Sequence, residues 1–240
     1  MNLSKNEKLR IIFIIVTWNR KKILDQCLQS LKKFVKSSYK ILVIDNASTD
    51  GSQKVVKEKH PEVTLIENVE NLGFSKANNI GINYIKTHKV KANYIIFLNN
   101  DTQFRDNSIE TLLGYLDKNS HIKAAIPTIL HDRKEYQTGI GGYELSLTSA
   151  FNYCFLLSIL LPKRFKGFFI HQKYFCKRRI IQEIDWLSGV CLAAKYSTVL
   201  KTMGFPEDFF MYAEDIAFSR NLRKFRKLIY YPLARIFHLR

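Results

Sequence analysis

The first half of the chain alternates short apolar runs with amphipathic or polar stretches. The apolar runs are rich in β-branched residues and occupy residues 11–16, 39–44, 63–67, 94–98 and 124–130. Unbroken runs of this kind are typical of strands that are buried on both faces. Between the runs, the patterns favour helices at residues 24–34, up to 59, within 68–83 and at 108–116. Strands alternating with helices predict a parallel, doubly wound α/β sheet with helices on both faces.

The pattern is weaker after residue 136. We expect a flexible loop at residues 139–142, a loop and then a strand within 183–194, and a short helix at 198–203. A helix is predicted at 211–225, and a strand followed by a final segment within 228–238. No repeat, linker or low-complexity tract divides the chain, so residues 1–240 are predicted to form a single domain.

Two of the apolar runs end directly on polar turns. Residues 45–51 read DNASTDG and residues 99–101 read NND. In open α/β sheets, ligands bind beyond the carboxyl ends of the strands. Carboxylates placed there hold a ribose or sugar hydroxyl, or a divalent metal that bridges phosphates. The alternative for both segments is a capping or Asx-rich turn without a ligand.

Near the other end of the chain, Glu214 and Asp215 follow the aromatic run FFMYA. A helix start stabilises the ionised carboxylate, whereas surrounding apolar rings would raise its pKa. A carboxylate tuned in this way serves as a general base towards a hydroxyl group, but ordinary first-turn capping is an equal alternative. His238 could bind a metal when neutral, although a single histidine is more often packed or exposed.

Charge is the unusual bulk property, because 38 basic residues stand against 21 acidic ones and the net charge is +17. Such an excess favours an anionic partner, although two solvated basic faces account for it equally well. Residues 145–182 contain no acidic residue, and none follows Asp215. Nucleic acid is not favoured as the partner, since no recognition motif is present and the acidic strand ends would repel phosphates that lack a metal.

The cysteines and the apolar segments indicate the cellular compartment in which the protein is expected. The four cysteines are scattered and form no C-x-x-C pair, which predicts neither a disulfide framework nor a zinc site and fits a reducing cytoplasm. The first ten residues are polar and lack a signal-peptide core. Residues 151–161 form an apolar stretch that is too short to cross a bilayer.

Taken together, several segments resemble the family 2 inverting glycosyltransferases, in particular the branch with bacterial rhamnosyltransferases and galactofuranosyltransferases. The matching segments are VTWNR at 16–20, VIDNASTDGS at 43–52, NLGFSKANNIG at 71–81, FLNND at 97–101, DWLSG at 185–189, FFMYAED at 209–215 and PLARIFH at 232–238. Each is weak alone, but their order over nearly the whole chain is specific. The resemblance implies a GT-A fold, with a nucleotide-sugar-binding half at 1–135 and an acceptor and catalytic half at 136–240.

The resemblance also implies roles for individual residues. Asp215, with Glu214, matches the catalytic base motif, and Asp101 and His238 match ligands of a divalent metal, Mg or Mn. The residues implied at the nucleotide-sugar are Thr17, Asn19, Asp45, Asn46, Asn71, Gly73, Asn78, Asn99 and Asn100. Those implied on the acceptor side are Asp185, Trp186, Ser188 and Gly189. The mechanism implied is one displacement at the anomeric carbon, which inverts its configuration.

The chain departs from the family pattern at three places. Ala217 stands where a further acid is common, Asn99 and Asn100 replace earlier acids of the metal motif, and the chain ends at Arg240, where many relatives continue. Asparagine at these places is familiar in the rhamnosyltransferase-like branch and favours dTDP-rhamnose as donor, with UDP-sugars next. The other two departures leave open a truncated or minimal enzyme, or a non-catalytic module that binds a glycan or a partner.

The expected acceptor is a glycan or a lipid-linked glycan of bacterial surface polysaccharide synthesis. Residues 151–179 mix aromatic and basic side chains, which suit the interface of an anionic membrane. We therefore expect a cytoplasmic protein that lies peripherally on the cytoplasmic face of the plasma membrane. The oligomeric state is not predicted.

Overall fold

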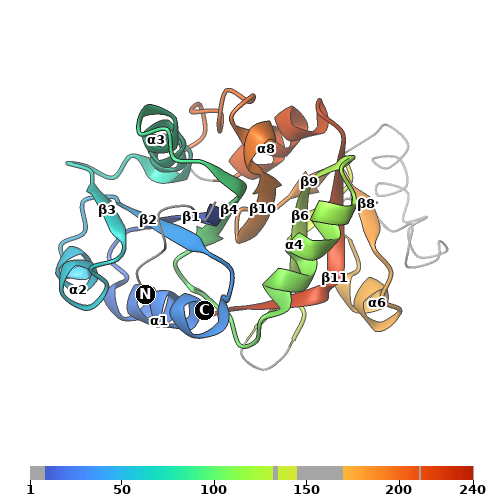
Figure 1. Ribbon diagram of the computed structural model, residues 1–240, viewed down its shortest axis with the longest axis horizontal. Coiled ribbons are helices and arrows are strands. Elements are labelled where there is room, and N and C mark those ends of the chain that lie inside the picture. Colours follow the sequence, from blue (N-terminus) through green and yellow to red (C-terminus); the bar gives the residue numbers. More distant parts are fainter. Residues whose placement is uncertain (1–8, 132–134, 145–169, 211, 240) are drawn as a thin grey trace, which may run out of the picture.

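The computed structural model describes residues 9–131, 135–144, 170–210 and 212–239. Figure 1 shows one layered α/β assembly in which helices flank a central sheet. The helices are α1 (Lys21–Phe34), α2 (Ser52–Lys59), α3 (Gly73–Thr87), α4 (Ser108–Lys118), α6 (Gln172–Lys177), α7 (Tyr196–Val199) and α8 (Glu214–Arg223). The strands are β1 (Leu9–Thr17), β2 (Tyr39–Asp45), β3 (Thr64–Glu67), β4 (Ala92–Asn99), β5 (Thr102–Gln103), β6 (Ile122–Leu130), β7 (Gly141–Gly142), β8 (Gln182–Ile184), β9 (Trp186–Leu187), β10 (Cys191–Lys195) and β11 (Lys227–His238).

Within the described residues, the main sheet has nine strands in the order β3-β2-β1-β4-β10-β6-β11-β5, with β8 also paired to β11. The long pairings of β1 with β2 and β4, of β2 with β3, and of β6 with β11 are parallel. The α/β class with a mostly parallel sheet is therefore confirmed. The strand β10 is antiparallel to both of its neighbours, β4 and β6, which the apolar pattern did not predict.

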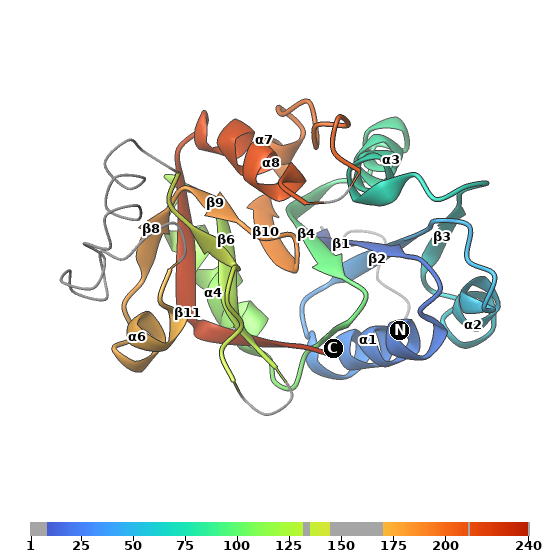
Figure 2. The ribbon, with the colours of Figure 1, turned by 180° about the vertical axis from the view of Figure 1, so that it is seen from behind.

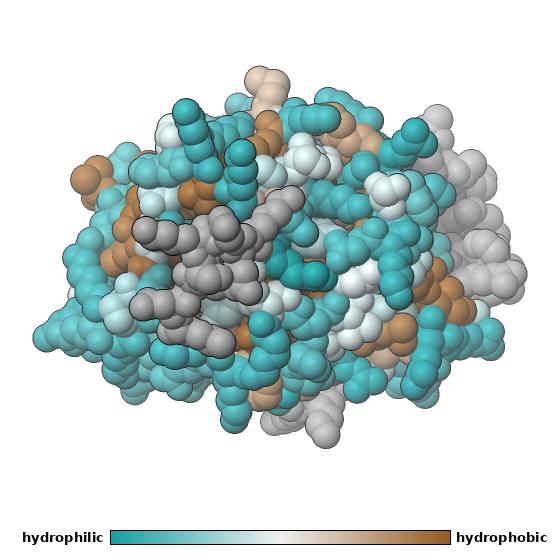
Figure 3. All heavy atoms as spheres, viewed as in Figure 1, coloured by the Kyte–Doolittle hydropathy of each residue, from teal (hydrophilic) through white to brown (hydrophobic). Residues whose placement is uncertain are grey.

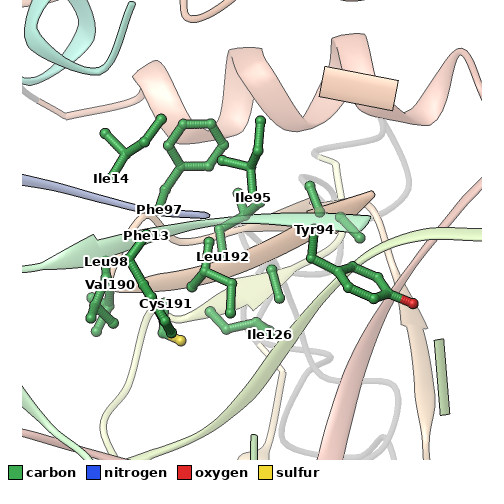
Figure 4. Close-up of a cluster of buried hydrophobic side chains, with 14 of the residues drawn as sticks. Phe13, Ile14, Tyr94, Ile95, Phe97, Leu98, Ile126, Val190, Cys191 and Leu192 are labelled. Atoms are coloured by element: carbon green, nitrogen blue, oxygen red, sulfur yellow. The ribbon is translucent and has the colours of Figure 1, made fainter. Parts of the chain in front are cut away.

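The core follows from the apolar runs, because residues 11–15 of β1 are all fully buried. In Figure 4, Ile14, Ile95 and Phe97 point to one face of the sheet, whereas Leu98 and Cys191 point to the other. Alternation of successive side chains between the two faces is the geometry of a strand covered on both sides. The sheet therefore needs a helical layer on each face.

Helices supply both layers. The buried stripe of α1 contains Leu24, Cys27, Leu28 and Leu31, which recur at helical spacing. Both ribbon views place α1 and α2 on one face of the sheet and α3 and α8 on the other, and Figure 2 shows α7 on the side of α8 (Figures 1 and 2). The helix α3 lies close to β1 because Gly81 has no side chain, and a Cβ there would come within 2.8 Å of Ile14.

Aromatic rings fix the start of α8 above the sheet. The ring of Phe97 on β4 meets Phe205 and Phe218 edge to face at 5.0 and 5.4 Å between centroids. Phe205 and Phe218 stack on each other at 4.0 Å. Each such pair contributes about 0.5–1.5 kcal/mol beyond the apolar area it buries. The cluster therefore anchors the helix that carries Glu214 and Asp215 directly on a central strand.

Two predictions for the second half were wrong in detail. The expected flexible loop contains β7, which pairs with β9, and a Cβ on Gly141 would lie 2.8 Å from Ile184, so this glycine permits close packing. The expected strand and final segment form one continuous strand, β11. Its register shifts between Tyr231 and Arg235, where Pro232 lacks an N–H for the ladder, so the strand passes the proline through a bulge.

None of the helices in the described ranges is long and apolar enough to cross a membrane. Cys27, Cys176 and Cys191 are buried free thiols, whereas Cys154 lies outside the described residues. Most of the expected membrane-facing segment, residues 151–169, also lies outside them.

Candidate active site

The polar strand ends meet at one edge of the sheet. Thr17 is opposite Asp45 in the pairing of β1 with β2, and Val16 is opposite Asn99 in the pairing of β1 with β4. The side-chain amide of Asn100 donates to Thr17 Oγ1 at 2.8 Å. The structure therefore brings together four residues that the resemblance assigned to the nucleotide-sugar, because parallel strands end at the same edge.

Asp45 is fully buried and only half satisfied. Its Oδ1 accepts hydrogen bonds from the Ser48 N–H at 2.8 Å and from Gln53 Nε2 at 2.7 Å. Its Oδ2 is buried and has no hydrogen-bond partner in the protein. Buried polar atoms nearly always have partners, so this oxygen is available to a donor that the protein itself does not supply. Sequence reasoning missed Gln53, because an amide in the first turn of α2 carries no local signal.

The loops that follow β1 and β2 are joined through Asn19. Its Oδ1 accepts from the Thr49 N–H at 2.7 Å, and its own N–H donates to Ser48 Oγ at 2.9 Å. The residue adopts a left-handed φ of 51°, which asparagine tolerates better than most residues. Asn19 therefore shapes the rim beside Asp45 through its own hydrogen bonds.

A second network joins the end of β2 to the start of α3. Asn46 Nδ2 donates to Asn71 Oδ1 and to the carbonyl oxygen of Gly73, both at 3.1 Å. Gly73 has a φ of 77°, and a Cβ there would lie 2.6 Å from the carbonyl oxygen of Phe210. The loop before α8 thus rests on this glycine. Asn78, also predicted at the donor, instead donates to the Phe74 carbonyl within its own helix at 3.0 Å.

The predicted metal ligands lie side by side. His238 Nε2 is 2.8 Å from Asp101 Oδ1, and their side chains are 12% and 27% exposed. The contact arises because β5 pairs with the end of β11, which places His238 opposite Thr102. The other ring nitrogen, Nδ1, lies 2.7 Å from Gln137 Oε1. Gln137 was not predicted, since it meets the histidine only through the folding of β11 beside β6.

The donor set fits a divalent cation that a substrate completes. Among the described residues, no group of three or more His, Cys, Asp or Glu side chains could hold a metal. Magnesium keeps several waters and binds through one or two carboxylates together with substrate phosphates, so few protein ligands are needed. Asp101 and His238 offer one carboxylate and one imidazole, and both side chains are partly exposed to solvent.

Asp215 lies in the first turn of α8 and is held by two backbone groups. Its Oδ1 accepts from the Ile216 N–H at 2.8 Å and its Oδ2 from the Gly189 N–H at 3.3 Å. Burial raises the pKa of this carboxyl, although the backbone donors oppose the shift. Val190 follows Gly189 in the chain, and its carbonyl oxygen accepts the Asn99 N–H at 3.0 Å. The loop before β10 therefore connects Asp215 to the end of β4.

Glu214 precedes Asp215 and is buried. Its Oε2 has no hydrogen-bond partner in the protein, and burial raises the pKa of this carboxyl. Tyr212 and Ala213 have φ values of 73° and 67°, an uncommon conformation for residues with a Cβ. At the position where a further acid was expected, Ala217 contributes only its backbone N–H, which donates to the Ala213 carbonyl.

The four residues implied on the acceptor side have different surroundings. Asp185 pairs with Arg223 at 3.0 Å and accepts from the Glu144 N–H at 2.8 Å, which fastens β9 to α8. Trp186 is 3% exposed and belongs to the core. Ser188 and Gly189 instead adjoin Asp215.

The residues that the resemblance implies for donor, metal and base lie at or beside the carboxyl ends of the central strands, and in first-turn and strand-end positions next to them. The family model for Glycosyl transferase family 2 matches residues 12–183, and the chain belongs to this family of glycosyltransferases. The match ends before α8 and β11, so Asp215 and His238 lie outside it. The positions of these two residues are therefore given by the structure and not by the family match.

Curated relatives in the same family include rhamnosyltransferases. The chain is 27% identical over 233 residues to the N-acetylglucosaminyl-diphospho-decaprenol L-rhamnosyltransferase of Mycobacterium tuberculosis, covering 94% of this chain and 74% of that protein. It is 23% identical over 210 residues to the rhamnosyltransferase WbbL of Escherichia coli K12, covering 86% of this chain and 74% of that protein.

Solved structures show the same fold at low sequence identity. GalNAc-T7 with UDP, GalNAc and Mn²⁺ superposes with a TM-score of 0.67 at 15% identity, over 99% of this chain. The mannosyltransferase PcManGT of Pyrobaculum calidifontis with GDP-Man and Mn²⁺ gives 0.61 at 17% identity, over 97% of this chain. The chain spans 45% and 57% of the length of these two structures. The GT-A fold predicted from the resemblance is confirmed.

Proposed function

We propose that the chain is a metal-dependent, inverting glycosyltransferase that moves a sugar from a nucleotide-diphosphate donor to a glycan or lipid-linked acceptor in bacterial surface polysaccharide synthesis. The favoured donor is dTDP-rhamnose, with UDP-sugars next, because two relatives that match 94% and 86% of this chain are rhamnosyltransferases. The observation that carries the proposal is the contact of Asp101 with His238 just after β4, together with Asp45 at the end of β2 and with Asp215 held by the loop whose Val190 carbonyl accepts the Asn99 N–H.

On the donor side, Asp45 offers its unpartnered Oδ2 to an N–H of the base or a hydroxyl of the ribose. Thr17, Asn19, Asn46, Asn71 and Gly73 shape the rim around it through their hydrogen bonds. Residues 1–135 bind the donor, and residues 136–240 supply the acceptor side and the base. Asp101 and His238 would hold the metal, which would supply positive charge to offset the negative charge of the diphosphate.

On the acceptor side, Asp215 takes the proton from the attacking hydroxyl. The freed oxygen forms the new glycosidic bond from the face opposite the nucleotide, and the bond to the diphosphate breaks in the same step. The raised pKa of Asp215 makes its carboxylate a stronger base than an exposed aspartate. The N–H groups of Gly189 and Ile216 hold both oxygens in place, so the base is oriented before the acceptor arrives.

The direct test is thermal stabilisation by nucleotides. We expect dTDP or UDP to raise the melting temperature only when Mn²⁺ is present, because a ligand that binds the folded state alone stabilises it. Turnover of the matching nucleotide-sugar, with inversion at the anomeric carbon, should follow. Stabilisation without any turnover would support a non-catalytic binding module. No stabilisation by any nucleoside diphosphate, with or without Mn²⁺, would contradict the proposal.

We also propose that the protein works at the cytoplasmic face of the plasma membrane. Exposed basic side chains lie on and directly after α6, namely Lys173, Lys177, Arg178 and Arg179, and in the turn between α8 and β11, namely Lys224 and Arg226. The face in Figure 3 is mostly hydrophilic, with hydrophobic residues scattered between. Each basic residue near an anionic surface contributes about 1 kcal/mol. We expect salt-sensitive flotation with anionic vesicles, and equal flotation with neutral vesicles would contradict the claim.

A further inference from the structure

His238 has a second neighbour besides Asp101, and that neighbour is firmly fixed. Gln137 is 8% exposed, and its backbone N–H donates to the Ile129 carbonyl at 3.1 Å. Its own carbonyl accepts from the side-chain amide of Gln172. The other end of that amide, Gln172 Oε1, accepts the Ile129 N–H at 3.1 Å. The end of β6 and the helix α6 therefore hold Gln137 in one position beside His238.

The atoms that meet at His238 decide which ring nitrogen carries the hydrogen. Gln137 Oε1 lies 2.7 Å from Nδ1 and is an acceptor, so Nδ1 must donate. A neutral imidazole has only one N–H, and Nε2 then presents a lone pair. That lone pair faces Asp101 Oδ1 at 2.8 Å. Two acceptors at this distance repel each other, so the close pair needs a cation between them; without one, the partly exposed Asp101 side chain is expected to turn toward solvent, which leaves the tautomer to Gln137.

We infer that Gln137 is a positioning residue that fixes His238 as the Nδ1–H tautomer, so that Nε2 and Asp101 together present lone pairs to a divalent cation. The inference rests on the proposed metal site. Ligating histidines generally donate their other N–H to a fixed acceptor, which sets the tautomer and the ring orientation. In this protein, the fixed acceptor is the side-chain amide oxygen of the buried Gln137.

The opposite amide orientation makes the opposite prediction. If the Gln137 amide donated to Nδ1, the hydrogen would lie on Nε2 and His238 would form an ordinary hydrogen bond with Asp101. Such a hydrogen bond would join the end of β11 to the chain beside β5 without any metal. The tautomer of His238 therefore distinguishes a metal ligand from a structural histidine.

The first measurement is the tautomer of His238 in the metal-free protein. Imidazole ¹⁵N shifts of histidine-labelled protein, recorded at about pH 8 where an ordinary imidazole is neutral, report which nitrogen is protonated. A His238→Gln sample assigns the signal. We expect Nδ1–H in the wild type and a loss of that preference in Gln137→Leu. An Nε2–H tautomer in the wild type would overturn the inference whatever the variants do.

The second measurement is Mn²⁺ affinity, followed by the electron paramagnetic resonance of free Mn²⁺ in the presence of dTDP or UDP. Gln137→Leu removes the acceptor and should weaken Mn²⁺ binding about 10- to 100-fold. Gln137→Glu keeps an acceptor and should bind at least as tightly as wild type. Equal affinity in folded Gln137→Leu and wild type would refute the inference alone, whereas no Mn²⁺ binding by wild type would refute the proposed metal site as well.

Discussion

The unpartnered oxygen of Asp45 leads to the sharpest prediction for the donor site. In Asp45→Asn, the retained Oδ1 still accepts from the Ser48 N–H and from Gln53, so the turn after β2 keeps its hydrogen bonds. The change replaces only Oδ2, which has no partner in the free protein. Folding stability should therefore be unchanged or higher, while donor binding should suffer. The variant should therefore bind the donor more weakly without any loss of folding stability.

The size of the binding effect follows from the hydrogen bond that the donor makes. A hydrogen bond to a charged group contributes about 1.5–3 kcal/mol, which corresponds to roughly 10- to 100-fold in affinity. Titration calorimetry with the nucleoside diphosphate and Mn²⁺ measures this loss, and urea denaturation of the ligand-free protein measures stability. We expect the nucleotide affinity of Asp45→Asn to fall by that factor.

Asp50→Asn is the matched control in the same turn. Both oxygens of Asp50 already have partners, since one accepts from the Lys21 N–H at 2.8 Å and the other from the hydroxyl of Ser52. This variant should lose stability and keep its nucleotide affinity. If Asp45→Asn bound the nucleotide as tightly as wild type, or if it lost as much stability as the control without losing affinity, the assignment of Oδ2 to the donor would be refuted.

Two further predictions concern stability. Burial raises the pKa of Asp25, but hydrogen bonds from Lys59, His60 and Gln29 outweigh it and lower the pKa from 3.8 to about 2. This stabilisation, at most about 2 kcal/mol, is present above the unfolded value and disappears as the pH falls through about 2, so Asp25→Asn should flatten the stability profile in acid denaturation. Gly73→Ala should cost at least about 1 kcal/mol in urea denaturation and slow transfer, because its Cβ would displace the loop before α8; wild-type values for both would contradict the role of this contact.

The first half of the sheet is predictable from the sequence because a local run of apolar residues specifies each strand. Residues 41–44 form an apolar run that ends on Asp45, and the strand β2 ends on the same residue. Parallel pairing then places the polar turns side by side, so the clustering of Thr17, Asp45 and Asn100 follows from the strand ends alone.

The structure of the second half of the chain depends on contacts between residues that lie far apart in the sequence. The apolar run of β10 would look the same in a parallel and an antiparallel strand, so its direction was not predictable. The pairing of Asp185 with Arg223 forms only once α8 packs beside β9, so it could not be predicted from the local sequence. Gln137 meets His238 for the same reason, because β11 must first fold beside β6.

The most direct test of the central claim is sugar transfer by Asp215→Asn, with Asp208→Asn in the preceding loop as an exposed control. The amide retains the shape of the side chain but cannot accept the proton, so we expect the transfer rate to fall about 10²- to 10⁴-fold while the affinity for nucleoside diphosphate and Mn²⁺ stays unchanged. The control should transfer at the wild-type rate. A wild-type transfer rate in Asp215→Asn would contradict the account, because no base would then be acting at the start of α8.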